Sequence, residues 1–320
     1  MSKISLAVDL AGLRLRNPTM NAAGVLGMSP PLLKRVYDAG AGAVVTKSIG
    51  PVPRSGHPNP TLVQVTGGAL NAMGLPNPGV NYFVDEIMKL KELGILTVAS
   101  FFGGNVQEFA DVAYKLTVAG ADALELNASC PNVADELGML AGDAENVEKV
   151  TTAVKDETSL PLFVKLSPNV TDIKAVSKAA ERGGADAITA VNTLLGIAID
   201  VNFRRPVLSN TTGGLSGPAM KPVALRCVWE VSQVVEIPVI GCGGVTTWED
   251  ALEYLMAGAS VVEIGTAVMT HGVEVYSEIV NGIERYLAEN GFSRIEEVVG
   301  IAHEAGKYAK GSLEKCSIRV

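Results

Sequence analysis

The sequence feature that most constrains the fold is an apolar segment of six or seven residues that recurs eight times, each time followed by an amphipathic segment. The apolar segments predict strands at 18–23, 42–48, 95–101, 123–129, 161–167, 186–192, 237–243 and 260–266. Helical patterns follow at 30–39, 82–93, 106–119, 144–157, 172–183, 222–234, 248–257 and 272–289. Eight strand–helix units over roughly 250 residues predict an α/β chain folded as a (β/α)₈ TIM barrel, with an open doubly wound sheet as the alternative.

The segments outside this repeat are expected to be additions to the barrel within one domain. Residues 4–16 alternate around Gly12 and predict a short N-terminal hairpin that covers one end of the barrel. Two long connections, 49–81 and 193–221, follow strand C-termini, so they are expected as inserted segments over the catalytic face. Residues 291–320 predict one more helix and a polar tail. No linker interrupts the chain, which predicts a single domain over 1–320.

Charge and cysteine usage exclude several classes of function. The net charge of −8 and the pI near 5.1 disfavour a nucleic-acid surface. No segment approaches the roughly 18 continuous apolar residues of a membrane span, and the N-terminus has no apolar core of a signal peptide. The cysteines and histidines are scattered, without a CxxC pair, at Cys130, Cys227, Cys242, Cys316, His57, His271 and His303. This pattern predicts a cytoplasmic protein with no metal site.

Polar residues gather at the predicted C-terminal ends of the strands, where a barrel of this kind carries its chemistry. They are Lys47-Ser48, Ser100, Asn127 to Cys130, Lys165 and Asn192-Thr193. Taken alone, Cys130 in ALELNASCPN fits a buried structural thiol as well as a functional one. The whole set, however, exceeds what core packing requires, which favours a catalytic mouth.

The last two predicted strands end in glycine. CGG at 242–244 and IGT at 264–266 leave backbone N–H groups accessible, and the helix that starts near Trp248 points its positive end toward them. The loops after strands seven and eight are the usual phosphate position in such barrels.

The motifs at these positions resemble those of dihydroorotate dehydrogenases over residues 5–270. In chain order they are VVTKS, NAMGLPNPG, LNASCPN, VKLSPN, AVNT, TGGLSGPAMKP, VIGCGGV and AGASVVEIGTA. The NTLLG to GGLSGPA run is most similar to the class 1B branch, whose catalytic subunit works with a separate electron-transfer subunit. One departure is SFFGG at the third strand, where many relatives have smaller residues after Asn or Ser.

The resemblance implies an FMN site and a substrate site. The implied cofactor-binding residues are Ala23, Gly24, Lys47, Ser48, Ser100, Asn127, Lys165, Val191, Gly217, Gly243, Gly244, Gly265 and Thr266. The implied substrate-binding residues are Lys47, Asn71, Ala72, Met73, Gly74, Leu75, Asn127, Asn192 and Thr193. Cys130 is the implied catalytic base, assisted by Lys47, and residues 131–142 are expected to form a lid. We interpret Cys242 as core packing.

The same resemblance implies the reaction and the partners. It implies oxidation of dihydroorotate to orotate in pyrimidine biosynthesis, with electrons passed to NAD through a subunit that carries FAD and a [2Fe–2S] cluster. A homodimer of this chain is expected, and the homodimer can bind that subunit to form a heterotetramer. Two alternatives remain open, a dihydropyrimidine dehydrogenase-like pyrimidine reductase and a fumarate-using class 1A enzyme.

Overall fold

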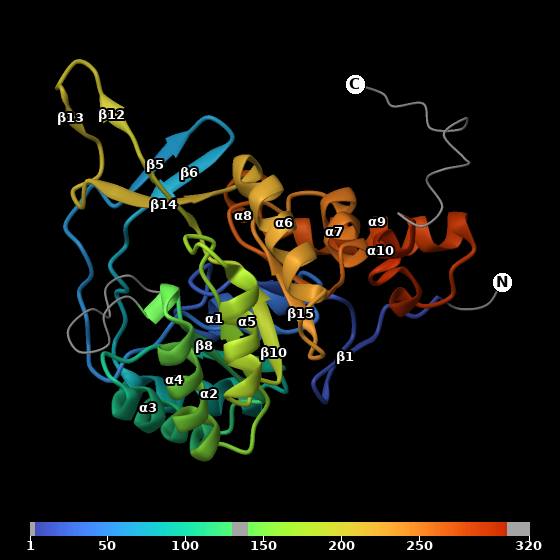
Figure 1. Cartoon of the computed structure of the whole chain (residues 1–320), viewed down its shortest axis with the longest axis horizontal. Coiled ribbons are helices and arrows are strands. Elements are labelled where there is room, and N and C mark those ends of the chain that lie inside the picture. Colours follow the sequence, from blue (N-terminus) through green and yellow to red (C-terminus); the bar gives the residue numbers. More distant parts are fainter. Residues whose placement is uncertain (1–3, 130–139, 306–320) are drawn as a thin grey trace.

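Eight parallel strands form the centre of the molecule (Figure 1). The computed structural model describes residues 4–129 and 140–305. The strands are β3 (Thr19–Asn21), β4 (Val44–Val45), β7 (Thr97–Phe101), β8 (Ala123–Asn127), β9 (Leu162–Lys165), β10 (Ala187–Ala190), β15 (Val239–Cys242) and β16 (Ala259–Ile264). They pair in the order β3-β16-β15-β10-β9-β8-β7-β4, and a parallel bridge between Met20 and Ala43 joins the two ends. The predicted barrel, rather than the open sheet, is therefore confirmed.

The predicted helices form the outer layer. They are α1 (Pro30–Asp38), α2 (Val80–Glu92), α3 (Val106–Ala119), α4 (Ala144–Asp156), α5 (Ile173–Arg182), α6 (Lys221–Ser232), α7 (Trp248–Met256) and α9 (Val275–Asn290). Helix α3 shows how the sequence pattern produces a helix: it buries Phe109, Ala113 and Leu116 on one stripe. Its N-cap residue is Asn105, whose side chain accepts from Glu108 N. A short helix, α8 (Val268–His271), precedes α9 and was not predicted.

The N-terminal hairpin covers the end of the barrel away from the loops that follow the strands. Strands β1 (Val8–Leu10) and β2 (Leu13–Leu15) pair antiparallel, and their apolar residues are buried while Asp9 and Arg14 are exposed. Arg14 shares a small cleft with Gly42 and Leu96, which lie just before β4 and β7. This location fits the predicted role of the hairpin.

The two long connections form one antiparallel sheet, which we call the insertion sheet. Its strands are β5 (Leu62–Val65), β6 (Gly68–Asn71), β11 (Leu194–Ile197) and β14 (Thr212–Ser216), in the order β11-β14-β6-β5. Strand β14 of the second connection pairs with β6 of the first, with Gly214 opposite Asn71. Figure 1 shows β5, β6 and β14 grouped on one side of the barrel strands. The sequence predicted the position of these insertions but not their joint sheet.

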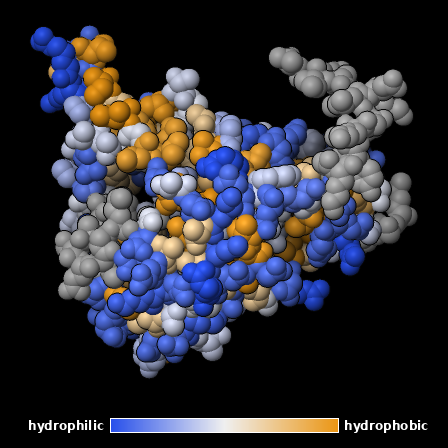
Figure 2. Space-filling model, viewed as in Figure 1, coloured by the Kyte–Doolittle hydropathy of each residue, from blue (hydrophilic) through white to orange (hydrophobic). Residues whose placement is uncertain are grey.

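One surface of the insertion is apolar. A hairpin of β12 (Ile199–Asp200) and β13 (Arg205–Pro206) extends it, and Figure 2 shows hydrophobic residues gathered over this part of the molecule. The exposed apolar side chains, which we call the insertion patch, are Leu195, Ile197, Ile199, Val201 and Phe203. Val201 and Phe203 are 79% and 71% exposed, so nothing in the described chain covers them.

The remaining elements are short. A 3₁₀ turn, η1 (Leu140–Gly142), precedes α4, and another, η2 (Pro218–Met220), leads into α6. The predicted C-terminal helix appears as η3 (Ile295–Val298) and α10 (Ile301–Ala305). Buried apolar residues from β1 to η3 belong to one continuous core. Among the helices within 4–129 and 140–305, none combines the length and apolar character needed to cross a membrane.

Candidate active site

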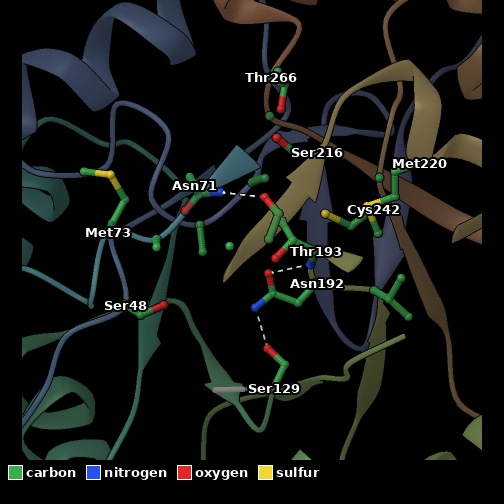
Figure 3. Close-up of a pocket in the computed structure, with 18 of the residues that line it drawn as sticks. Ser48, Asn71, Met73, Ser129, Asn192, Thr193, Ser216, Met220, Cys242 and Thr266 are labelled. Atoms are coloured by element: carbon green, nitrogen blue, oxygen red, sulfur yellow. Dashed lines mark hydrogen bonds between the residues drawn. The ribbon is translucent and has the colours of Figure 1, made fainter. Parts of the chain in front are cut away.

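A cavity of about 490 Å³ lies between the C-terminal ends of the barrel strands and the insertion sheet. Barrel strands β8 and β9 contribute Asn127 and Lys165, and the insertion contributes Asn71 and Ser216. In Figure 3, Thr266 and Ser129 lie on opposite sides of the cavity, as do Met73 and Cys242. The cavity is therefore surrounded by segments from both halves of the chain.

Most of the predicted site residues line this one cavity. They are Ala23, Lys47, Ser48, Asn71, Ala72, Met73, Gly74, Leu75, Asn127, Lys165, Val191, Asn192, Thr193, Gly217, Gly243, Gly244, Gly265 and Thr266. Gly24 and Ser100 are outside the lining, and Cys130 and most of the predicted lid lie outside the described residues. Sequence analysis missed lining residues that the insertions and connecting loops supply, among them His57, Asn169 and Ser216. The individual roles remain predictions.

A chain of hydrogen bonds fixes the polar side chains at the barrel end. The Ser100 and Ser48 hydroxyls are 3.0 Å apart, and Asn127 Nδ2 donates to Ser48 Oγ at 3.2 Å. Ser129 Oγ donates to Asn127 Oδ1 at 2.6 Å, and Asn192 Nδ2 donates in turn to Ser129 Oγ. Ser100 is fully buried behind Ser48, so in the structure it supports a lining residue. The network presents two amide groups in defined orientations.

Lys47 places a cation beside this network. It follows the short strand β4, and its backbone N–H donates to Gly27 O at 2.9 Å. A Cβ on Gly24 would lie 3.2 Å from Lys47 Nζ, and one on Gly27 would lie 2.4 Å from Lys47 N. The loop after β3 therefore needs small residues to pack against Lys47. Gly24 keeps a φ of +91° and leaves the ammonium group room within the cavity wall.

The glycine loops after β15 and β16 form the other end of the cavity. A Cβ on Gly244, whose φ is +73°, would lie 2.8 Å from Gly217 O and 2.9 Å from Lys221 N. Tyr254 donates to Gly243 O at 2.5 Å and holds this loop from the helix side. Within 4–129 and 140–305, no hydrogen bond uses the backbone N–H of Gly244 or Thr266. These amides can receive an anionic group such as a phosphate.

Helix α7 contributes less to this end than its position in the sequence predicted. Its N-cap residue Thr247 forms a capping box with Asp250. Asp250 Oδ2 accepts from Thr246 N at 2.8 Å and from Thr247 N at 3.0 Å. A carboxylate of the protein therefore already compensates the positive end of this helix.

The insertion side requires close backbone approach. A Cβ on Gly214 would lie 2.0 Å from Thr193 Oγ1, and one on Gly213 would lie 2.7 Å from Asn71 O. Asn169 Nδ2 donates to Thr193 O at 3.0 Å, which holds the start of β11. The glycine pair thus brings β14 directly against both predicted substrate-binding residues, Asn71 and Thr193.

Sequence analysis missed two carboxyl groups beneath the cavity. Lys165 Nζ donates to Glu263 and lies 3.8 Å from Glu125 Oε2, and both glutamates are fully buried. Burial and the charge of Glu263 raise the pKa of Glu125 to about 8. Burial also raises the pKa of the Cys242 thiol far above its usual range, so this cavity-lining thiol is neutral. The available signal was a charged residue in the middle of an otherwise apolar strand, in ALELN and VVEIG.

The arrangement suits a flat, partly polar ligand with an anionic end. The glycine loops offer amides to the anion, Val191 and Met220 offer apolar contact, and Lys165 supplies a cation at the barrel end. These features fit the phosphate, ring system and pyrimidine edge of FMN. The amides near Lys47 are left for a second, smaller ligand.

Comparison with known proteins agrees with this geometry. The family model described as "Dihydroorotate dehydrogenase" matches residues 5–287. A Pyrococcus horikoshii protein is 52% identical over 303 residues, which cover 94% of this chain and 99% of that protein. A Methanosarcina mazei protein is 52% identical over 301 residues, covering 93% and 96%, and a Pyrococcus furiosus protein is 50% identical over 302 residues, covering 94% and 100%. All three are named dihydroorotate dehydrogenase B (NAD(+)), catalytic subunit.

Proposed function

Because this chain belongs to the dihydroorotate dehydrogenase family, we propose that it oxidises dihydroorotate to orotate in pyrimidine biosynthesis, with FMN as cofactor. The observation that carries the proposal is the single cavity that joins a glycine-lined anion site, a buried lysine and a group of oriented amides. When bound, FMN would accept the hydride from C6 of the substrate. The chain's own residues would bind and orient the substrate and remove its C5 proton.

Residues at the glycine loops and at Lys165 would hold FMN. Gly243, Gly244, Gly265 and Thr266 would bind its phosphate through backbone N–H groups. Lys165 would face the pyrimidine edge of the ring, where a cation stabilises the negative charge of the reduced state. Ala23, Gly24, Lys47, Ser48, Ser100, Asn127, Val191 and Gly217 complete the proposed cofactor set, with Ser100 acting through Ser48.

The amides and Lys47 would hold the substrate. Dihydroorotate is an anionic cyclic imide, so it needs a cation and several groups that both donate and accept hydrogen bonds. Asn127 and Asn192 are already oriented by Ser48 and Ser129. The remaining proposed contacts come from Thr193 and from Asn71, Ala72, Met73, Gly74 and Leu75.

Cys130 is the proposed base. It is the next residue after Ser129, which lines the cavity and bonds to Asn127. A thiolate can remove the C5 proton as the hydride leaves C6, and a nearby cation such as Lys47 lowers the pKa of a thiol. We propose residues 131–142 as the lid over this reaction.

We further propose that the electrons reach NAD through a second subunit that carries FAD and a [2Fe–2S] cluster. The names of the relatives, with "B (NAD(+))" and "catalytic subunit", support this route. In the described part of the chain, no group of three His, Cys, Asp or Glu residues is placed to hold a metal ion. The free buried thiols Cys227 and Cys242 fit a reducing, cytoplasmic location.

The proposed assembly is a single-domain protomer of residues 1–320 that forms a homodimer. We assign the insertion patch to the contact with a second copy of this chain, because an exposed apolar cluster of this kind is typical of subunit interfaces. A heterotetramer forms when two electron-transfer subunits join this dimer.

The test is anaerobic reduction of the purified chain. We expect a yellow protein that releases FMN on denaturation, is bleached by dihydroorotate, and reduces dyes but not NAD. Co-expression with the electron-transfer subunit should add NAD reduction. A colourless chain that cannot be reconstituted with FMN would contradict the proposal. Faster turnover with uracil derivatives would favour the pyrimidine reductase, and efficient use of fumarate would favour class 1A.

A further inference from the structure

Two acidic residues that the proposed mechanism does not use surround the lysine beneath the cavity. Glu125 on β8 and Glu263 on β16 converge on Lys165 from β9. Thr189 Oγ1 on β10 donates to Glu125 Oε2 at 3.1 Å. The second oxygen of each carboxyl group, Oε1, is buried and has no hydrogen-bond partner among the residues that the structure describes.

The charges of this cluster do not balance when both carboxyl groups are ionised. One ammonium group would then face two carboxylates at sites that are fully closed to solvent, leaving one negative charge uncompensated. An uncompensated charge in the protein interior is costly, and two adjacent carboxyl groups avoid it by retaining one proton between them. Burial and the charge of Glu263 raise the pKa of Glu125 to about 8.

On the proposed function as premise, we propose that Glu125 and Glu263 are positioning residues for Lys165 that share one proton at neutral pH and thereby set the charge at the pyrimidine edge of FMN. With that proton, the cluster is neutral and Lys165 is held as a fixed cation. Without it, the cluster carries one negative charge beside the place where reduction adds another.

The other groups that face this cluster do not change charge in the same range. Burial opposes the charge on Lys165, but the carboxyl groups of Glu125 and Glu263 outweigh it and raise its pKa above the usual value, so it stays cationic. Burial raises the pKa of the Cys242 thiol on β15 and of Tyr276 on α9, so both stay neutral. Thr189 does not titrate. Among the described groups that face this cluster, the proton shared by the glutamates is therefore the one that responds near neutral pH.

The consequence is an extra proton coupled to reduction. Reduction of FMN to its anionic two-electron form takes up one proton. Because the added negative charge would raise the affinity of the glutamate pair for its proton, reduction at a pH between the pKa of the pair in the oxidised state and its raised pKa in the reduced state would take up a second one. The midpoint potential should then fall twice as steeply with pH in that range as below it.

The experiment measures the FMN midpoint potential from pH 6 to pH 10 in the wild type and in the Glu125→Gln and Glu263→Gln variants. Glutamine mimics a protonated glutamate, and the remaining carboxylate stays paired with Lys165. We expect the doubled slope in the wild type and the single slope throughout in both variants. Glu86→Gln is the control, because Glu86 is also buried but pairs with Lys89 on α2 at 2.6 Å; it should keep the doubled slope.

Infrared spectroscopy provides a readout that does not need turnover. The wild type at pH 7 should show the carbonyl band of a protonated carboxylic acid that disappears at alkaline pH and is missing from both variants, where the flavin bands remain. Absence of that band from the wild type would overturn the shared proton. A band without any difference in slope between the wild type and the variants would overturn its coupling to the flavin. Failure of the chain to bind FMN would contradict the proposed function, whereas the infrared band would still decide whether the proton is shared.

Discussion

Single side chains at the barrel end are held by short, directional contacts. The network from Ser100 to Asn192 leaves Asn127 and Ser129 little rotational freedom, since each makes contacts to two neighbours. Cys130 directly follows this fixed pair in the sequence. Preorganisation of this kind reduces the entropy that a reacting group must lose.

The proposed base gives the prediction at this scale. Cys130→Ala should retain FMN but lose about 10²- to 10⁴-fold of the rate of flavin reduction by dihydroorotate, the range that a general base usually contributes. Cys130→Ser should retain a little activity with an optimum at higher pH, because serine ionises less readily than cysteine. Stopped-flow absorbance measures both, and Cys227→Ala, a buried thiol on α6 outside the cavity, is the control. A near-normal rate of flavin reduction in Cys130→Ala would show that another group removes the C5 proton of dihydroorotate.

The sequence predicted the positions of site residues well where they lie near the end of a strand, and poorly where they lie within a strand. Lys47, Asn127, Lys165 and Asn192 lie at or just after the ends of strands of a recognisable barrel, so their convergence followed from the topology. The ion cluster did not follow, because Glu263 and Lys165 are 98 positions apart and only the closed barrel brings them into contact.

Among the secondary-structure elements, β14 carries the most specific constraint. It pairs with β11 on one side and β6 on the other, and its glycines allow both neighbours to approach. Eight barrel strands were predictable from apolar runs bounded by glycine. The insertion sheet was not, because its strands are short and their pairing joins Asn71 to Gly214, which are 143 positions apart. Helix α8 was missed because four residues give no helical period.

A substitution in β14 tests this constraint. In Gly214→Ala the new Cβ would lie 2.0 Å from Thr193 Oγ1, so the strand or the threonine must move. We expect at least about a tenfold weaker binding of orotate, the equivalent of about 1.4 kcal/mol, with FMN content unchanged. Gly196→Ala in β11 is the matched control, because its Cβ would meet only the flexible end of Leu70 at 3.0 Å. Equal orotate affinity in the two variants, measured by titration of the flavin spectrum, would remove β14 from the substrate site.

At the scale of the whole molecule, the insertion both closes the cavity and exposes an apolar surface. The barrel end near the hairpin is covered by the chain itself, whereas the insertion patch is not covered by any described residue. Because this apolar surface lies on the same insertion as one wall of the cavity, binding of another subunit to the surface can stabilise that wall.

The prediction for this surface concerns the oligomeric state. Val201→Glu combined with Phe203→Glu should convert the dimer to a monomer, because burying two carboxylates in an apolar contact is costly. Sedimentation equilibrium measures the mass, and Tyr114→Glu on α3, which is 54% exposed, is the control on another surface. A double variant that remains dimeric but no longer binds the electron-transfer subunit would assign the patch to that partner instead.

The pairing of β6 with β14 also determines when the site can exist during synthesis of the protein. Ribosomes add about 5 to 20 residues per second, so the 143 positions between Asn71 and Gly214 take about 7 to 30 s to translate. Until then, β6 has left the ribosome without the strand that joins it to the second insertion. Nascent chains that end between Lys165 and Thr212 therefore contain Lys47, Asn127 and Lys165 but lack one wall of the cavity, and they cannot retain substrate however well their half of the barrel has formed.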